Sequence, residues 1–341
     1  MEIIAYLDDN REWTKEDIDV ENLSCINYAF ADIVDGRIQR SLKKINLVNQ
    51  LKKKSPHLKS CISVGGWSAD GFSDAVLTEK SRMILIESVL KYIEKYDFDG
   101  IDLDWEYPKV DLAGITARDE DAENLLLLLK ELRNELDKLE EKNKKKYLLT
   151  IAVGASFELL ETTATKNGHE YAEYIDYINI MTYDMRGSFT NVTGHHANLY
   201  PYDQQDKLSV SESVDYLMSK GIPAKKIVIG AAFYGRVWEG VTSNKNNGLM
   251  QYAGKTGCKA FDYNEIGELI KKYPDNVFVD KVAKSPYYFD GKTFISFENP
   301  YSLQEKAQYI KEKNLRGIMY WEHSLDRSGE LVKAIVEKSK G

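Results

Sequence analysis

The stretch FDGIDLDWEYP, residues 98–108, combines the pattern of a buried strand with four acidic residues, Asp99, Asp102, Asp104 and Glu106. Side chains alternate between the two faces of a strand, so the last three acids share one face. Apolar residues occupy the opposite face: Ile101, Leu103 and Trp105. Asp99 has the other parity, and alternation alone assigns it no role.

Seven further apolar, β-branched runs are typical of strands, and stretches of helical period lie between them. The eight candidates are residues 3–7, 24–33, 60–66, 98–106, 147–155, 174–183, 226–234 and 316–321. Buried strands that alternate with helices predict an α/β fold closed into a parallel (β/α)8 or TIM barrel. A doubly wound open sheet is the alternative. It would require a glycine-rich turn after the first strand, where this chain has LDDNREW.

The segment between the seventh and eighth strand candidates is too long for a single helix. It contains a helix-like piece (262–273) and strand-like pieces in VFVDKVA, YYFD and TFISF. We therefore expect a barrel made of residues 1–239 and 301–341, with a small α+β insertion domain at 240–300. On a barrel, such an insertion rises from the C-terminal face and can wall one side of a cleft.

Within a barrel, Asp102, Asp104 and Glu106 would point into the lumen, with Glu106 at the C-terminal mouth where catalytic groups of this fold lie. Neighbouring buried carboxylates cannot all be charged, so they share protons. This predicts a terminal glutamic acid that keeps its proton near neutral pH and acts as a general acid. A solvated acidic edge is excluded by the intervening apolar residues. A Mg²⁺ or Ca²⁺ site is disfavoured because one strand presents its acids in a row rather than around a centre.

The segment DGIDLDWE fits the DxxDxDxE signature of glycoside hydrolase family 18, the chitinase family. Further segments resemble motifs of that family in the same order: SVGGW (63–67), MTYD (181–184), FYGR (233–236) and YWE (320–322). These matches cover essentially the whole chain, and the insertion is similar to that of the deep-cleft chitinases. The segment ENPYSLQEK departs from the family, which often has acidic residues at the positions of Asn299 and Pro300.

The resemblance implies a chitinase that hydrolyses β-1,4-linked N-acetylglucosamine with retention, using the substrate's own acetamido group. Glu106 would be the acid and then the base. Asp104 would hold the acetamido N–H, and Asp102 would share a proton with Asp104. Tyr183 would hydrogen-bond the acetamido oxygen, and Asp184 would contact the same sugar.

Six more side chains are candidates for substrate contact: Trp321, Trp67, Tyr234, Arg236, Tyr6 and Phe30. By resemblance, Trp321 lies beneath the distorted sugar ring, and Trp67, Tyr234 and Arg236 wall the cleft. Core packing is the alternative for Trp67 and Tyr234, and support of neighbouring carboxylates for Arg236. Tyr6 and Phe30 either line the base of the pocket or fill the structure. We expect Gly65 and Gly66 to permit close backbone approach.

The formal net charge of −8 argues against nucleic acid or an anionic membrane as partner and leaves a neutral sugar open. No metal or cofactor is expected. The three cysteines lack zinc or disulfide spacing, and His195 and His196 are predicted to lie in a polar loop. The expected partners are chitin or chitooligosaccharides, and the expected state is a monomer.

The localisation is left open by the first residues, because MEIIAYL is already strand-like. Either the protein is not exported by a signal peptide and is cytoplasmic as encoded, or its leader is not part of this sequence. Two other functions are considered. One is an endo-β-N-acetylglucosaminidase acting on N-glycans or wall glycans. The other is a non-catalytic chitin-binding lectin, against which the presence of Glu106 argues.

Overall fold

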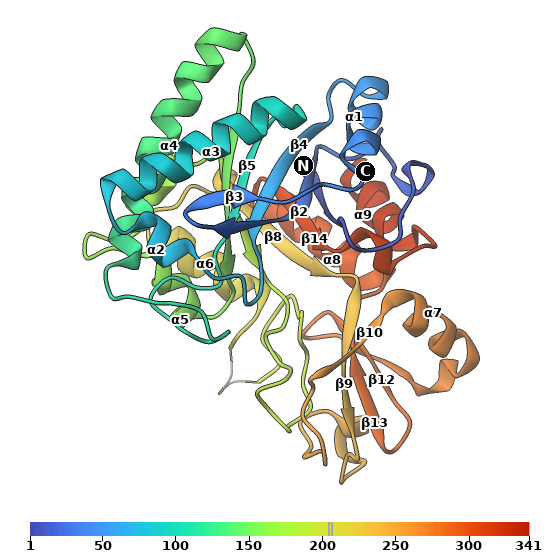
Figure 1. The fold of residues 1–341 in the computed structure, drawn as a ribbon. Coiled ribbons are helices and arrows are strands. Elements are labelled where there is room, and N and C mark those ends of the chain that lie inside the picture. The colour runs from blue at the N-terminus through green and yellow to red at the C-terminus, as the bar shows by residue number, and fades with distance from the viewer. Residues whose placement is uncertain (204, 206, 341) are drawn as a thin grey trace.

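The computed structural model describes residues 1–203, 205 and 207–340. Eight parallel strands form a closed barrel, because β14 pairs with β1 and β1 pairs with β2 (Figure 1). The barrel strands are β1 (Glu2–Asp8), β2 (Cys25–Val34), β4 (Lys59–Gly65), β5 (Gly100–Asp104), β6 (Leu148–Gly154), β7 (Tyr177–Met181), β8 (Ile227–Ala232) and β14 (Gly317–Trp321). The predicted (β/α)8 barrel is confirmed, with all eight strand candidates in it. A short strand, β3 (Arg37–Gln39), pairs with β2 as an antiparallel hairpin.

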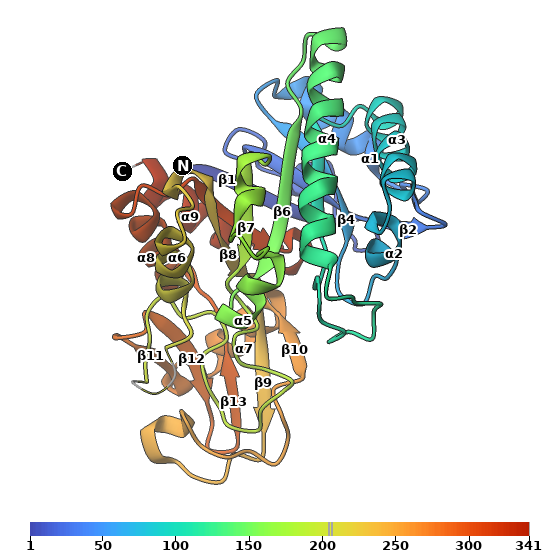
Figure 2. The same cartoon turned by 90° about the vertical axis from the view of Figure 1, so that its left-hand side faces the viewer.

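Helices cover the outside of the barrel, and the long helices α3 and α4 pack against each other there (Figure 2). Both lie in stretches of helical period in the sequence, residues 78–96 and 120–142. The N-cap of α3 is Thr78, whose side chain accepts a hydrogen bond from the Ser81 amide. The helices of this layer are α1 (Ile45–Lys54), α2 (Phe72–Val76), α3 (Glu79–Tyr96), α4 (Asp121–Asn143), α5 (Phe157–Leu160), α6 (Val210–Ser219), α8 (Pro300–Glu312) and α9 (Glu330–Lys340).

The two faces of the barrel strands build two separate cores. Ile101, Leu103 and Trp105 belong to the core between the strands and the helices, where Trp105 stacks on Phe72 at 5.1 Å. The lumen holds a smaller apolar cluster that includes Tyr6. The alternation predicted for β5 is therefore confirmed, and the opposite parity points Asp102 and Asp104 into the lumen.

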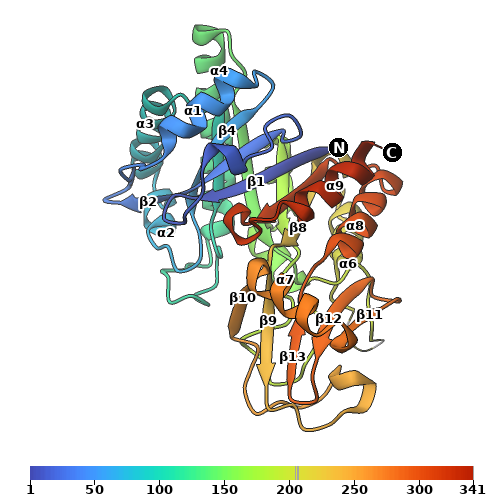
Figure 3. The ribbon, with the colours of Figure 1, turned by 90° about the vertical axis from the view of Figure 1, so that its right-hand side faces the viewer.

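A second sheet follows β8 almost without a break and forms the insertion (Figures 1 and 3). It is a five-stranded antiparallel sheet in the order β10-β9-β13-β12-β11. Its elements are β9 (Tyr234–Glu239), β10 (Lys259–Asp262), α7 (Tyr263–Lys272), β11 (Val277–Asp280), β12 (Ser285–Phe289) and β13 (Thr293–Ser296). The insertion between the seventh and eighth barrel strands is thus confirmed. Strand β9 lies within the range 1–239 assigned to the barrel but pairs with β10 and β13, and the exact domain division stays a prediction.

The insertion leaves the barrel at the carboxyl ends of its strands, because β8 ends at Ala232 and β9 starts at Tyr234. The loops after β5, β6 and β7 emerge at the same end. This is the end at which barrels of this kind place their active sites. Across the part of the chain that the structure describes, no helix combines the length and apolarity of a membrane span.

Candidate active site

Asp102 lies deep in the lumen and is fully buried. It accepts four hydrogen bonds: Tyr6 Oη at 2.8 Å, Ser63 Oγ at 2.8 Å, Thr150 Oγ1 at 2.6 Å and Asn179 Nδ2 at 3.1 Å. Burial raises the pKa of Asp102, and these donors oppose the rise. The donors come from four different strands, so they hold Asp102 in one orientation at the base of the site.

Asp104, two residues further along β5, is nearly as buried but lacks comparable partners. Its Oδ1 accepts no hydrogen bond from any described residue. Burial, followed by the charges of Glu106 and Asp102, raises the pKa of Asp104 well above its usual value. The carboxyl therefore either holds a proton or awaits a donor from a ligand.

Glu106 follows the end of β5 at the mouth of the barrel. Burial raises the pKa of Glu106 to about 7, helped by the charge of Asp184 and opposed by a hydrogen bond with Tyr107. A carboxyl with a pKa near neutrality can give and take a proton at physiological pH. The sequence prediction placed a proton on this residue for the same reason, the burial of neighbouring carboxylates.

Close backbone contact between β4 and β5 depends on Gly65. A Cβ atom at this position would lie 2.2 Å from the Asp104 carbonyl oxygen. The amide of Gly66 donates to that same oxygen at 2.8 Å. The close approach expected for these two glycines is confirmed, and it fixes the backbone that carries Asp104.

Asp184 forms a bidentate ion pair with Arg236, with both nitrogen–oxygen distances at 2.6 Å. The Nδ1 atom of the buried His196 lies 3.7 Å from Asp184 Oδ1. Burial alone would raise the pKa of Asp184, but His196 and Arg236 outweigh it and hold that pKa well below its usual range. Asp184 is therefore a permanently charged carboxylate of the site. Arg236 supports this carboxylate, which is one of the two roles that the sequence analysis considered for it.

Aromatic side chains surround the lumen acids. Trp321, at the end of β14, stacks on Phe30 with 5.4 Å between the ring centroids. It also packs against Tyr6, with 5.8 Å between the centroids. The ring of Tyr183 meets that of Tyr234 edge-on at 6.2 Å. Tyr234 is 7% exposed, so it packs in the interior. Their contacts with a substrate stay predictions.

Trp67 is 61% exposed, which excludes the core-packing alternative for this residue. It follows β4, next to β5 in the barrel. An exposed indole at the rim presents a flat apolar face to a ligand.

The two adjacent histidines lie in the loop between β7 and α6, as expected, but they are fully buried. His195 Nε2 lies 3.2 Å from Asp280 Oδ2 of the insertion, and the His196 amide donates to Ser296 Oγ at 2.9 Å. Both therefore fasten the loop to the insertion. Nowhere in residues 1–203, 205 and 207–340 do three or more His, Cys, Asp or Glu side chains gather as a metal site would require.

The sequence analysis missed three of the donors to Asp102: Ser63, Thr150 and Asn179. Each is a polar residue inside an otherwise apolar strand, and that contrast was the available signal.

A (β/α)8 barrel with a row of buried carboxyls at its C-terminal mouth is an arrangement that glycoside hydrolases use. The chain belongs to glycosyl hydrolases family 18, whose sequence model matches residues 2–326.

Several proteins similar to this chain are named as chitinases, and one as an N-acetylglucosaminidase. Chitinase A1 of Niallia circulans is 38% identical over 306 residues, which cover 84% of this chain and 43% of that protein. An N-acetylglucosaminidase from Paenibacillus barengoltzii has a TM-score of 0.92 at 40% identity and covers 99% of both chains. The chain spans 43–64% of the length of the first curated relatives it matches.

Relatives in this family bind chitooligosaccharides. A family 18 chitinase from Cycas revoluta, solved in complex with (GlcNAc)4, has a TM-score of 0.85 at 24% identity and covers 99% of both chains.

Proposed function

We propose that the protein is a chitinase that hydrolyses β-1,4-linked N-acetylglucosamine with retention of configuration, using the acetamido group of the substrate as nucleophile. The observation that carries this proposal is the pairing of Asp104 with Glu106. Asp104 has a buried oxygen without a donor among the described residues, and Glu106 beside it has a pKa raised to about 7. An acetamido N–H is a neutral donor that would satisfy the unpaired Asp104 oxygen, while Glu106 acts as the acid.

In the first step, Glu106 gives its proton to the glycosidic oxygen, and the bond from that oxygen to the anomeric carbon breaks. The acetamido carbonyl oxygen forms a new bond to the same carbon, which gives an oxazolinium ion. Asp104 holds the acetamido N–H and offsets the positive charge. An intramolecular nucleophile replaces a costly encounter by fixed geometry.

In the second step, water attacks the anomeric carbon, the bond from the acetamido oxygen to that carbon breaks, and the water passes a proton to Glu106, which restores the acid. Two inversions at one carbon retain the β configuration. Asp102, held by its four donors, shares a proton with Asp104. Tyr183 and Asp184 position the acetamido group and the sugar, and Trp321 supports the distorted ring.

Replacement of Glu106 tests this proposal. We expect Glu106→Gln to lower kcat/KM on an aryl chitobioside by roughly 10²–10⁴-fold, because the amide cannot donate a proton in the transition state. The control is Glu123→Gln on the exposed face of α4, which should match the wild type. In the wild type, kcat/KM should fall as the pH rises through about 7, since only protonated Glu106 is the acid. Near-normal turnover by Glu106→Gln would reject the assignment.

A second candidate activity is that of an N-acetylglucosaminidase, which the similarity to the Paenibacillus barengoltzii enzyme favours. It would use the same carboxyls and the same acetamido chemistry. Comparing kcat/KM on aryl glycosides of N-acetylglucosamine and of chitobiose separates the two. A preference for the monosaccharide glycoside would favour this second activity, and release of glycan from an N-glycoprotein would favour the endo-β-N-acetylglucosaminidase alternative.

A further inference from the structure

The four hydrogen-bond donors to Asp102 divide evenly between its two carboxyl oxygens. Oδ2 accepts the hydroxyls of Tyr6 and Ser63, both at 2.8 Å. Oδ1 accepts Thr150 Oγ1 at 2.6 Å and Asn179 Nδ2 at 3.1 Å. An ionised carboxylate accepts about four hydrogen bonds and donates none. The donor set therefore matches Asp102 in its charged form.

A protonated Asp102 would fit these surroundings poorly. Its proton would need an acceptor, and the Asn179 amide nitrogen cannot be one. The hydroxyls of Ser63 and Thr150 can turn to accept it, but neither makes any other hydrogen bond within the described residues. A hydroxyl that turned would leave its own hydrogen buried without an acceptor, which costs free energy.

Asn179 forgoes a contact of its own to donate to Asp102. Its side chain is fully buried in β7, and its Oδ1 has no donor among the described residues. The same Nδ2 lies 3.4 Å from Tyr6 Oη, so the amide also contacts a second donor to Asp102. Buried polar atoms without partners are uncommon and call for a reason. The reason here is the contact with Asp102, which an aliphatic side chain of the same size could not make.

The barrel register fixes Thr150 and Asn179 beside Asp102. Thr150 is the direct partner of Asp102 across β5 and β6, and Asn179 pairs with Ala152, two residues further along β6. Thr150 and Asn179 are both fully buried. Because strand pairing holds both donors in place, the Oδ1 side of Asp102 is preorganised for a negative charge.

Asp104 is the other carboxyl that could carry the charge, and it lacks such a donor set. Its Oδ1 is buried without a donor in the described chain. Burial, followed by the charges of Glu106 and Asp102, raises the pKa of Asp104 well above its usual value. Burial also raises the pKa of Asp102, but its four donors oppose that rise. Of the two carboxyls, Asp102 is the one whose contacts favour the anion.

Other titratable groups near Asp102 stay neutral in acidic solution. Four of them are close enough for its charge to act on them: Tyr6, Cys61, Tyr177 and Tyr183. Burial raises the pKa of the three tyrosines, and a hydrogen bond with Cys25 together with burial raises the pKa of Cys61. Glu106 keeps its proton below about pH 7. Asp104 is therefore the group that titrates together with Asp102 at acidic pH.

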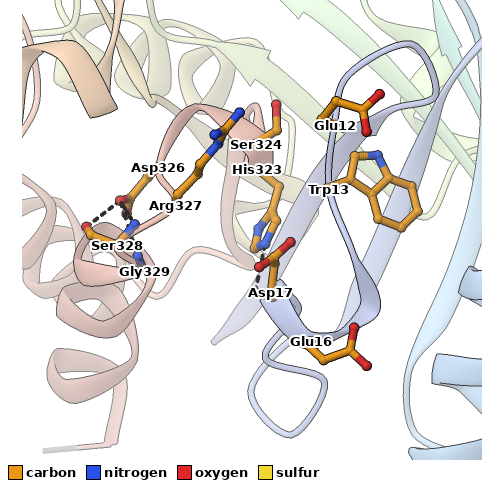
Figure 4. Close-up of a pocket in the computed structure, with 10 residues that line it drawn as sticks. All are labelled: Glu12, Trp13, Glu16, Asp17, His323, Ser324, Asp326, Arg327, Ser328 and Gly329. Atoms are coloured by element: carbon orange, nitrogen blue, oxygen red, sulfur yellow. Dashed lines mark hydrogen bonds between the residues drawn. The ribbon is translucent and has the colours of Figure 1, made fainter.

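Asp326 is a buried carboxylate with the same number of hydrogen bonds but a different surrounding. In the pocket of Figure 4 it accepts the Ser328 hydroxyl and three backbone amides, those of Ser328, Gly329 and Leu331. These groups lie at the start of α9, where such contacts satisfy free backbone amides. At Asp102, by contrast, all four donors are side chains from separate strands. They serve the carboxylate rather than a helix end.

We propose that Thr150 and Asn179 are positioning residues that hold the first negative charge of the Asp102–Asp104 pair on Asp102. This deepens the proposed function, on which it rests, because that chemistry needs one charge and one shared proton in the pair. In the free enzyme the charge lies at the base of the site, and the proton lies on Asp104, nearer to Glu106. Full protonation of the pair at low pH abolishes activity, since no charge is then left to offset that of the oxazolinium ion.

The acidic limb of the pH profile of kcat/KM tests this inference, because it reports ionisation in the free enzyme. On an aryl chitobioside we expect Thr150→Val, which keeps the shape and removes the hydroxyl, to move this limb upward by roughly one pH unit, as the loss of a hydrogen bond to a charged group implies. The limb moves upward because the lost donor had stabilised the charged form, so the pKa of the pair rises. Thr150→Ser keeps the hydroxyl and should restore the wild-type limb.

Two further variants complete the test. Asn179→Leu removes the second donor to Oδ1 and should move the acidic limb in the same direction. Ser328→Ala removes one donor from Asp326, outside the lumen, and should leave the limb at its wild-type position. A limb that stays in place in both Thr150→Val and Asn179→Leu, with kcat/KM lowered by the same factor at every pH, would overturn the inference and leave the proposed function intact. Failure of the wild type to hydrolyse the chitobioside would instead reject the proposed function.

Discussion

Asp102 and Asp104 occupy alternate positions of one strand, and their hydrogen bonding makes them different groups. Asp102 has four donors and is held in place. Asp104 has an oxygen without a donor in the described chain and adjoins Glu106. A buried carboxyl left without partners costs stability, and such costs concentrate where a ligand will supply the missing contact.

Replacing Asp104 by asparagine should reveal this cost. Because the folded pKa of Asp104 is raised above its unfolded value near 4, folding is penalised as the pH rises above that value. Asp104→Asn removes the charge, so we expect it to raise the free energy of unfolding by about 1–3 kcal/mol at pH 8 while activity falls. Near pH 4 most of the gain should be lost, because the wild-type carboxyl is then protonated in the folded state and about half protonated in the unfolded state.

Thermal unfolding of the two proteins at pH 4 and pH 8 measures this difference. A variant that is less stable than the wild type at pH 8, or equally stabilised at both pH values, would contradict the assignment of a buried, unpaired carboxyl.

Asp99, whose role strand alternation left open, serves the opposite end of the barrel. Its carboxylate pairs with Lys52 at 2.8 Å and Lys145 at 2.9 Å, and it accepts the Ser60 amide at 2.9 Å. Burial alone would raise its pKa, and the two lysines lower it. Asp99 therefore anchors the start of β5, seven residues before Glu106.

At the scale of elements, a buried ion pair fastens the insertion's exit to the barrel. Lys306 of α8 lies 2.8 Å from Glu298, and both side chains are 1% exposed. Lys306 also donates to the Gly230 carbonyl at 3.0 Å, and Glu298 accepts the Ala232 amide at 2.8 Å. The pair thus ties α8 and the segment after β13 to β8.

Removing one member of the Lys306–Glu298 pair should therefore destabilise the folded protein. We expect Lys306→Met to lower the free energy of unfolding by about 3–5 kcal/mol, because it leaves Glu298 buried without its cation. Adding Glu298→Gln should recover much of that loss. Lys313→Met, which breaks the exposed pair with Asp215, should cost less than about 1 kcal/mol. Denaturant unfolding at pH 7 measures all four proteins, and a Lys306→Met variant as stable as the Lys313→Met control would refute the role of the pair.

The fold was predictable because alternation and helical period are local patterns. The parity of Asp102 and Asp104 placed their side chains in the lumen before any coordinates. The run KIVIGAAFY was predicted as one strand but contains the boundary between the two sheets. Strand β8 ends at Ala232, and Tyr234 starts β9 of the second sheet. Apolar content is the same on both sides of that boundary, so composition carries no signal for it.

The site was predictable in part. The family motifs pointed to the acids, whereas the donors to Asp102 come from strands far apart in the sequence. Thr150 is in register with Asp102 across β5 and β6, and Asn179 reaches it from β7. Such contacts depend on barrel closure and register, which no local pattern encodes. The ion pairs of Asp99 with Lys52 and Lys145 could not be predicted from the sequence for the same reason.

At the scale of the whole molecule, the barrel supplies the acids, and β9 of the insertion supplies Arg236, which pairs with Asp184. The proposed chemistry uses only these carboxyls and the acetamido group of the substrate. We therefore expect incubation with EDTA to leave kcat/KM on an aryl chitobioside unchanged. Strong inhibition that added Mg²⁺ or Ca²⁺ reverses would instead support a metal site.

The configuration of the first product tests the account most directly, because displacement by the substrate's acetamido group followed by attack of water retains the configuration, whereas direct attack of water on the glycoside inverts it. Proton NMR of early chitooligosaccharide hydrolysis resolves the two anomers before they interconvert. The account predicts that the new reducing end appears first as the β anomer. Initial appearance of the α anomer would contradict it.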